Sequence, residues 1–261
     1  MPRSPSRSSS GKAKPGADSG GGFIESLRTV GYAVVFALVV RTFLFEPFNI
    51  PSGSMIPTLL VGDYLFVSKY TYGYSKHSFP FSPSLFSGRI FHSEPERGDV
   101  AVFKLPTDNK TDYIKRIVGL PGDRIQVISG ILHVNGKPVI RRRIADFDLE
   151  VAGGRRGKAV QYREVLPGGY THPIIEMERD SGYLDNTAVY SVPKGRYFMM
   201  GDNRDNSQDS RVLNRVGFVP AENLVGKAEF LFFSTNGAAR LWEVWKWPFS
   251  IRYGRLFNSI D

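Results

Sequence analysis

The sequence of 261 residues contains no cysteine, which excludes disulfide bonds, thiol nucleophiles, iron–sulfur clusters and cysteine-based zinc sites. Histidine is scarce as well, because only His77, His92, His133 and His172 could supply an imidazole. Any chemistry that this chain performs is therefore expected to use hydroxyl, amine and carboxylate groups. No metal ion or other cofactor is indicated.

Acidic residues are in short supply, with 25 Asp and Glu against 34 Lys and Arg, so the formal net charge is +9. A positive surplus suits an anionic membrane surface as well as nucleic acid. Part of the surplus lies in the first 22 residues, and no groove-reading motif follows, so we expect no nucleic-acid partner. With 41% hydrophobic residues, most of the chain is expected to fold.

The N-terminal region changes character abruptly. Residues 1–22 consist mainly of Ser, Pro, Gly and basic residues, which predicts a disordered basic tail. Thr29 to Phe45 is almost wholly apolar and just long enough to cross a bilayer, with Arg41 able to reach the headgroups. A buried core helix or a cleaved secretory signal are the alternatives, and no small-x-small cleavage site follows the apolar run. We expect a membrane anchor over residues 23–46.

The body of the chain favours β-structure. Alternating apolar residues and the turn pairs Ser129-Gly130 and Asn135-Gly136 predict a short meander with two hairpins. The predicted fold class is mainly β: a single N-terminal transmembrane helix, then an antiparallel β-sheet catalytic region with a smaller inserted β subdomain. The expected boundaries are residues 47–140 and 195–261 for the β-rich catalytic region and residues 141–194 for the more polar inserted subdomain. Strands are predicted at residues 99–104, 124–128, 131–134, 138–140, 197–200 and 228–233.

A stiff turn follows the apolar segment. Residues 51–59 read Pro-Ser-Gly-Ser-Met-Ile-Pro-Thr-Leu, and small residues between two prolines can hold a hydroxyl and backbone N–H groups in fixed positions. On composition alone, a plain juxtamembrane linker is an equally good interpretation. A serine here would need a base, because its hydroxyl is a poor nucleophile until the proton is removed.

The best candidate base is Lys115. It lies in the run Asp112-Tyr113-Ile114-Lys115-Arg116-Ile117-Val118, whose alternating apolar residues predict a strand with one buried face. A solvated lysine has a pKa of about 10.4, whereas burial against apolar groups lowers the pKa and makes a neutral amine available. The alternative is a lysine that reaches solvent from a strand edge. A histidine-based triad is not favoured, since no histidine has a comparable setting.

The third informative stretch is residues 201–211, Gly-Asp-Asn-Arg-Asp-Asn-Ser-Gln-Asp-Ser-Arg. Its short polar side chains predict a tightly hydrogen-bonded loop. A calcium-binding loop would need glycine at its sixth position and glutamate at its twelfth, and neither is present counting from Asp202 or Asp205.

Taken in order, these three stretches resemble the motifs of bacterial signal peptidase I, the leader peptidase of the Ser–Lys class. The resemblance implies Ser54 as the nucleophile and Lys115 as the general base. It further implies Ser52 in the oxyanion hole and Ser207 as the residue that orients the amine. Structural support would come from Tyr113, Asp209 and Arg211, and the apolar substrate pockets from Phe48, Ile50, Pro51 and Ile114. The stretch from Val212 to Val216 is longer than in the family's shortest form.

The resemblance implies a membrane-anchored serine endopeptidase that removes N-terminal signal peptides after an Ala-x-Ala-like site. Its partners would be signal-peptide-bearing preproteins and membrane phospholipid, without an obligate protein partner. Basic residues before the apolar segment place the N-terminus in the cytoplasm and the catalytic region on the outer, periplasmic side of the bacterial inner membrane. The alternatives are a Ser–Lys peptidase specialised for a pilin or conjugation substrate, and a non-enzymatic anchored β-domain. The aromatic and basic C-terminal segment from Leu241 suits either lipid headgroups or packing on the sheet.

Overall fold

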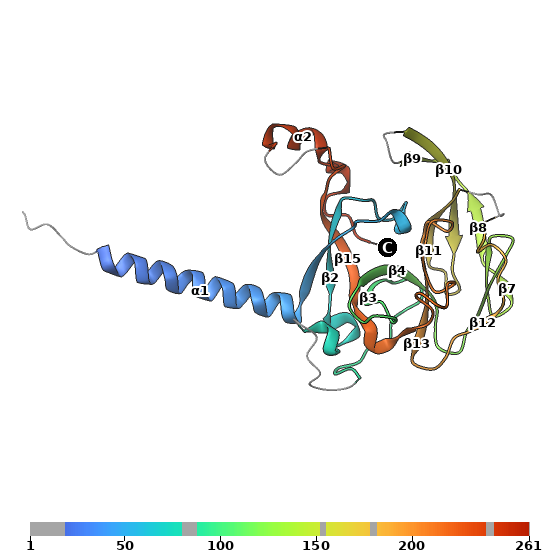
Figure 1. Cartoon of the computed structure of the whole chain (residues 1–261), viewed down its shortest axis with the longest axis horizontal. Helices are drawn as coiled ribbons and strands as arrows, with labels where there is room; N and C mark the ends of the chain where they lie inside the picture. The colour runs from blue at the N-terminus through green and yellow to red at the C-terminus, as the bar shows by residue number, and fades with distance from the viewer. Residues whose placement is uncertain (1–18, 80–87, 152–154, 178–181, 239–242, 261) are drawn as a thin grey trace, which may run out of the picture. The chain divides into compact units, whose positions relative to one another are not determined.

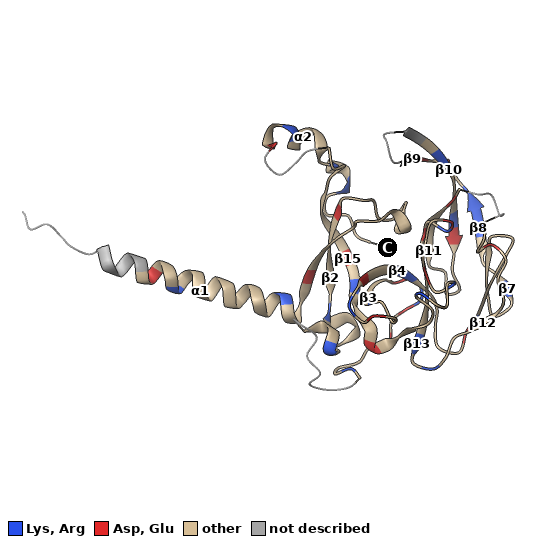
Figure 2. Cartoon of the chain, in the orientation of Figure 1, with Lys and Arg blue, Asp and Glu red and all other residues tan. Residues whose placement is uncertain are grey.

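The computed structural model of the chain describes residues 19–79, 88–151, 155–177, 182–238 and 243–260 (Figure 1). Helix α1 (Ser19–Phe43) contains a segment, Ile24–Phe43, that is long and apolar enough to cross a membrane. No charged residue stands between Arg28 and Arg41, so this stretch is uniformly uncharged in Figure 2. Its large apolar side chains are exposed, with Phe36 at 71%, which is unfavourable in water and favourable in lipid.

Pro47 accounts for the end of α1. It has no N–H to donate to the carbonyl of Phe43, and its ring would clash there in a continuing helix. The Tyr74 hydroxyl donates to that carbonyl instead, over 2.7 Å. The chain then becomes extended, so Phe45 begins a strand rather than ending the apolar helix, as its hydropathy alone had suggested.

The largest sheet has seven strands in the order β1-β2-β15-β3-β4-β13-β14, and every pair is antiparallel. Strand β2 pairs with β15, although the two strands are far apart in the sequence (Figure 1). This sheet brings the start and the end of the body together. The strands are β1 (Phe45–Asn49), β2 (Asp63–Ser68), β3 (Val100–Lys104), β4 (Asp112–Gly119), β13 (Arg196–Met200), β14 (Val219–Pro220) and β15 (Leu224–Ser234).

Two smaller four-stranded sheets are formed by the segment between β4 and β13. One has the order β12-β5-β6-β7, and in the other β10 pairs with β8, β9 and β11. The predicted hairpins are confirmed: Ser129-Gly130 and Asn135-Gly136 all have positive φ, as tight turns between twisted strands require. The strands are β5 (Arg124–Ile128), β6 (Ile131–Val134), β7 (Lys137–Pro138), β8 (Ile140–Arg143), β9 (Phe147–Val151), β10 (Arg155–Val165), β11 (Thr171–Glu176) and β12 (Tyr190–Ser191).

Short helical turns connect several of these strands, and η1 carries Ser54. Three more helical turns follow β15, and one of them, the four-residue helix α2, lies within the aromatic C-terminal segment. Their bounds are η1 (Gly53–Met55), η2 (Tyr70–Tyr72), η3 (Lys76–Ser78), η4 (Ala221–Asn223), η5 (Val244–Lys246), α2 (Trp247–Ser250) and η6 (Tyr253–Arg255).

The core of the large sheet fixes the stretch that follows α1. Met55 and Leu59 are completely buried in the same cluster as strands β2, β3 and β15, and the C-terminal Ile260 closes it. Burial of each such side chain contributes on the order of 2 kcal/mol. The residues after α1 are therefore an integral part of the body and not a loose linker.

The fold class predicted from the sequence is confirmed: the chain is mainly β and antiparallel, with one apolar N-terminal helix. The small sheets begin at Arg124, ahead of residue 141 where the inserted subdomain was expected to start. Helix α1 begins at Ser19, and residues 1–18 of the predicted basic tail lie outside the described residues. In the C-terminal segment, Trp245 and Phe249 are 65% and 86% exposed and do not pack into the sheet.

Candidate active site

Ser54 is held in a rigid turn. It lies in η1, directly before the buried side chain of Met55, and its own exposed fraction is 8%. Asn203 binds this turn twice: its backbone N–H donates to the carbonyl of Ser54 over 3.1 Å, and its Nδ2 atom donates to the carbonyl of Gly53 over 3.0 Å. The hydroxyl of Ser54 therefore has a fixed position relative to the loop that follows β13.

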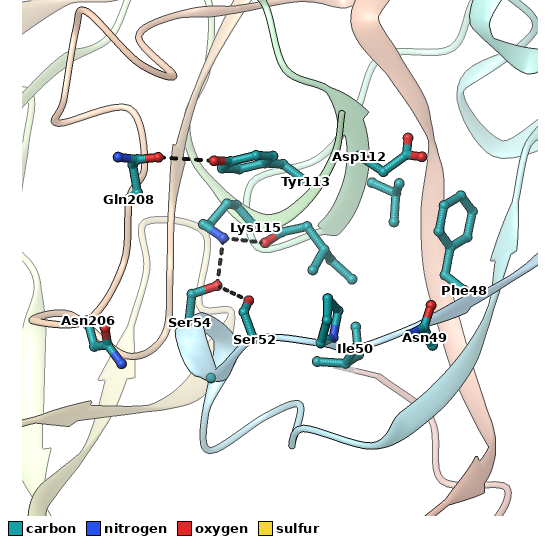
Figure 3. A pocket seen from close by; sticks show the side chains of 14 residues that line it. Phe48, Asn49, Ile50, Ser52, Ser54, Asp112, Tyr113, Lys115, Asn206 and Gln208 are labelled. Atoms are coloured by element: carbon teal, nitrogen blue, oxygen red, sulfur yellow. Dashed lines mark hydrogen bonds between the residues drawn. The ribbon is translucent and has the colours of Figure 1, made fainter. Parts of the chain in front are cut away.

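Lys115 reaches this hydroxyl from the large sheet. It lies in β4, and its Nζ atom is 2.7 Å from Ser54 Oγ and 2.8 Å from the carbonyl oxygen of Ile114 (Figure 3). The amine also lies 5.4 Å from the centroid of the Tyr113 ring. These contacts bring together residues from two of the three sequence motifs.

Burial changes the chemistry of this lysine. The side chain is 3% exposed, and desolvation lowers its pKa from 10.5 to about 8, although the charges of Asp209 and Asp202 oppose the change. A useful fraction of the amine is then neutral near physiological pH, and a neutral amine can accept a proton. The alternative of a lysine that reaches bulk solvent is wrong for Lys115.

The two other serines of interest lie near Ser54 but differ in their contacts. Ser52 Oγ is 3.5 Å from Ser54 Oγ, at the limit of a hydrogen bond. Ser207 is buried, and its side chain packs against Gly201 close to the carbonyl of Ser54. Among the hydrogen bonds of the described residues, none joins the Ser207 hydroxyl to the amine of Lys115.

The loop at residues 201–211 is organised by an ion pair. Arg211 binds Asp209 through two hydrogen bonds of 2.9 Å, and both side chains are at least 99% shielded from solvent. Asp209 also accepts from the backbone N–H of Gly201. Burial opposes ionisation of Asp209, but the charge of Arg211 outweighs it and holds the pKa of Asp209 below its usual value. Arg211 also donates to the carbonyl of Arg204, which closes the loop.

A second buried ion pair, between Arg116 and Asp202, was not singled out from the sequence. The guanidinium donates to both carboxylate oxygens over 2.9 and 2.8 Å. Thr58 donates to the same carboxylate over 2.5 Å. The pair thus joins β4, the loop after β13 and the turn that carries Ser54. Arg116 and Asp202 belong to the motifs quoted above, but nothing in the local pattern indicates that they are partners.

A third buried ion pair, between Arg204 and Glu164, lies close to the pair of Arg116 and Asp202, and His172 lies beside both carboxylates. Arg204 pairs with Glu164 of β10, and His172 Nε2 is 3.4 Å from that carboxylate. Burial lowers the pKa of His172 to about 4, with Arg116 contributing, so this imidazole is neutral at pH 7. His172 is not among the residues that line the cavity beside Ser54. Its position in β11 explains why it offers no alternative base.

A cavity of about 530 Å³ opens over the Ser54 hydroxyl. All four residues predicted for the apolar pocket line it, and Phe48 and Ile114 pack against the main core below. Figure 3 shows Phe48 and Ile50 on one side of Ser54, with Asn206 and Gln208 on the other. The complete lining consists of Phe48, Asn49, Ile50, Pro51, Ser52, Gly53, Ser54, Val102, Asp112, Tyr113, Ile114, Lys115, Asn206 and Gln208.

A hydroxyl beside a desolvated amine, at the base of an open cavity, is an arrangement suited to nucleophilic hydrolysis. The sequence comparisons agree with this chemistry. The family model described as "Signal peptidase, peptidase S26" matches residues 23–233. The chain belongs to this family. It is therefore a serine endopeptidase that acts on signal-peptide-bearing preproteins, and its apolar helix fits the membrane span of such an enzyme.

Individual relatives support the assignment to the signal peptidase family. The signal peptidase I of Rickettsia canadensis (strain McKiel) is 43% identical over 251 residues, covering 89% of this chain and 92% of the relative. That of Rickettsia typhi (strain ATCC VR-144 / Wilmington) is 42% identical over 247 residues, covering 88% and 90%. A crystal structure of a signal peptidase I from Enterococcus faecalis V583 matches at 25% identity and a TM-score of 0.29, covering 52% of this chain and 97% of the other. The assignment rests on the sequence matches alone.

Proposed function

We propose that Ser54 is the nucleophile and Lys115 the general base of this signal peptidase. The observation that carries the proposal is the 2.7 Å separation of Lys115 Nζ from Ser54 Oγ, combined with a pKa of about 8 for the amine. A base that is neutral at the working pH and already in contact with the hydroxyl needs no rearrangement before it removes the proton.

The proposed reaction has two halves. Lys115 takes the proton of Ser54, and Ser54 Oγ bonds to the scissile carbonyl carbon as the C=O pair moves to oxygen. The tetrahedral intermediate collapses, the C–N bond breaks, and the protonated amine gives its proton to the leaving nitrogen. In the second half, Lys115 removes a proton from water as the water oxygen attacks the carbonyl carbon of the ester. The bond between that carbon and Ser54 Oγ then breaks, and the protonated amine returns its proton to Ser54.

The negative oxygen of the intermediate needs hydrogen-bond donors. We assign this role to the hydroxyl of Ser52 and the backbone N–H of Ser54, which lie on the same turn. Loss of one such donor typically costs about 3 kcal/mol of transition-state stabilisation. We assign Ser207, whose side chain lies beside the turn of Ser54, as a positioning residue, and Ser207→Ala should alter the pH dependence of cleavage.

Substrate selection is assigned to the apolar side of the cavity. Phe48, Ile50, Pro51 and Ile114 line the cavity beside Ser54, and the family resemblance implies that the pockets they form admit small side chains only. We therefore propose cleavage after a small-x-small sequence of the Ala-x-Ala type. Bulky residues at either small position should lower kcat/KM by more than tenfold, since overpacking a fixed apolar wall is unfavourable.

We further propose a single-pass anchor with the catalytic region on the outer side of the bacterial inner membrane. Arg3, Arg7, Lys12, Lys14 and Arg28 precede the apolar segment, and only Asp18 and Glu25 oppose them. The positive-inside rule then leaves the N-terminus in the cytoplasm. Because a signal peptide is itself a membrane-embedded segment, an enzyme anchored nearby meets the cleavage site at the membrane surface.

The test is cleavage of a purified preprotein by the full chain in phospholipid vesicles. Ser54→Ala and Lys115→Met should each lower kcat/KM by about 10³-fold or more, with an unchanged circular dichroism spectrum. Matched controls are Ser191→Ala and Lys194→Met, because both residues are exposed and neither lines the cavity. Near-normal cleavage by Ser54→Ala or Lys115→Met would refute the assignment. An enzyme that cleaved only a pilin-type substrate would instead favour the specialised alternative.

A further inference from the structure

The side of the cavity opposite the apolar wall is lined by two amides. Asn206 and Gln208 are exposed, line the same cavity as Ser54 and take no part in the reaction proposed above. Figure 3 shows both on the other side of Ser54 from Phe48 and Ile50. Asn49 and Asp112 line the cavity on the side of Phe48, so the reactive hydroxyl lies between a side that is apolar only in part and a side that carries the two amides.

One of these amides has a fixed orientation. The Tyr113 hydroxyl donates to Gln208 Oε1 over 3.0 Å, which occupies the accepting end of the amide (Figure 3). The other end, Nε2, can only donate. In the described part of the chain, no hydrogen bond from Nε2 of Gln208 or from the amide of Asn206 reaches another protein group. These donors are thus available to a bound substrate.

The direction of the substrate follows from the proposed function, on which this inference rests. If the small residues before the cut lie against Phe48, Ile50 and Ile114, the chain after the cut leaves on the side of Asn206 and Gln208. We propose that these two amides form a subsite for the first residues of the mature protein. The subsite favours side chains that accept hydrogen bonds, such as Glu, Asp or Gln, over apolar ones.

A purely supporting role for Gln208 makes a different prediction. By holding Tyr113, whose ring centroid is 5.4 Å from the amine of Lys115, Gln208 could stabilise the base. Its loss would then slow cleavage of all substrates to the same extent and would alter the pH profile. A subsite instead changes the ratio of rates between substrates that differ only after the cut.

The experiment uses the full chain in phospholipid vesicles and three peptides with the same Ala-x-Ala site. They carry Glu, Gln or Leu at the first position after the cut. The wild type should cleave the Glu and Gln peptides with a higher kcat/KM than the Leu peptide, by about fivefold, the size expected of one partly exposed hydrogen bond. Gln208→Leu should abolish this preference, and Gln208→Glu should select against the Glu peptide while sparing the Gln peptide. Gln161→Leu, in β10 and outside the cavity lining, is the control.

The outcomes separate the two proposals. Equal slowing of all three peptides in Gln208→Leu, with the wild-type ratios retained, would overturn the subsite and leave the catalytic assignment intact. A wild type without any preference among the peptides would overturn it as well. If the wild type cleaved none of the peptides, both the subsite and the proposed function would be contradicted.

Discussion

The amine of Lys115 lies 2.7 Å from the hydroxyl of Ser54, and both side chains are at least 92% shielded from solvent. These residues are 61 positions apart in the chain. The turn η1 supplies Ser54, and the interior strand β4 of the large sheet supplies Lys115. The proposed chemistry depends on this contact, and its consequences can be measured.

The first consequence is a pH-dependent rate. Only the neutral amine can accept a proton, so kcat/KM should rise with pH through about 8 and level off above it. The measurement is cleavage of one peptide from pH 6 to 11, with structure monitored by circular dichroism across the range. A rate that rises only above pH 10 would show that the working base is a solvated lysine.

The second consequence concerns stability. Below pH 8 the folded protein holds a buried charge, and lowering the pKa from 10.5 to about 8 corresponds to a cost of about 3 kcal/mol. Between these values the unfolded state binds more protons, so this cost shrinks with rising pH and is gone above 10.5. Lys115→Met should therefore be more stable than wild type at pH 7, and this advantage should shrink by about 3 kcal/mol by pH 10.5.

Thermal unfolding of the two proteins over this pH range provides the measurement. The control is Lys194→Met, which removes an exposed lysine and should leave the stability difference independent of pH. A Lys115→Met protein that is less stable than wild type at pH 7 would mean that the amine is well compensated in the fold.

The third prediction concerns Gly201. A methyl group added there would lie 2.2 Å from Ser207 Oγ and 2.5 Å from the carbonyl oxygen of Ser54. Gly201→Ala should therefore displace the nucleophile turn, lower kcat by at least tenfold and destabilise the fold by about 1–3 kcal/mol. Gly254→Ala is the control, since an added methyl meets nothing within 4 Å. Normal activity of Gly201→Ala would show that the turn tolerates displacement.

The fourth prediction concerns the buried pair of Arg116 and Asp202. Each single variant, Arg116→Met or Asp202→Leu, leaves one buried charge without its partner and should cost about 3–5 kcal/mol in the free energy of unfolding. The double variant should cost less than the sum, because it leaves neither charge. Denaturant unfolding of the four proteins measures this coupling. Strictly additive costs would mean that the pair is not a unit.

Sequence patterns predicted much of the fold because the relevant information is local. The hairpin turns at Ser129-Gly130 and Asn135-Gly136 depend on neighbouring residues. Alternation predicted the strand that carries Lys115, but the expectation of one buried face was wrong, because every residue from Lys115 to Gly119 is buried. The end of helix α1 was less well predicted. Hydropathy continues through Phe45, whereas the missing N–H of Pro47 ends the helix earlier.

The partners of the buried charges could not be predicted in the same way. Asp202 binds Arg116 and Thr58, which lie far from it in the sequence, and only the folded sheet brings them together. The same holds for His172, which is 2% exposed in β11 and lies beside Glu164 and Asp202 only in the folded chain. The pairing of a serine of the turn with Lys115 was expected from the strand setting of Lys115, and the family resemblance then implied Ser54 as its partner; spacing along the chain did not indicate it.

The most direct test is the titration of the Lys115 side chain itself, followed by NMR of Lys115 Nζ or Cε in the full-length protein with Lys115→Met for resonance assignment. The account predicts a midpoint near pH 8. It also predicts that Ser54→Ala, which leaves the apolar surroundings in place, keeps the midpoint well below that of an exposed lysine. A midpoint near 10.5 in the folded wild-type protein would contradict the central claim that Lys115 is a desolvated base.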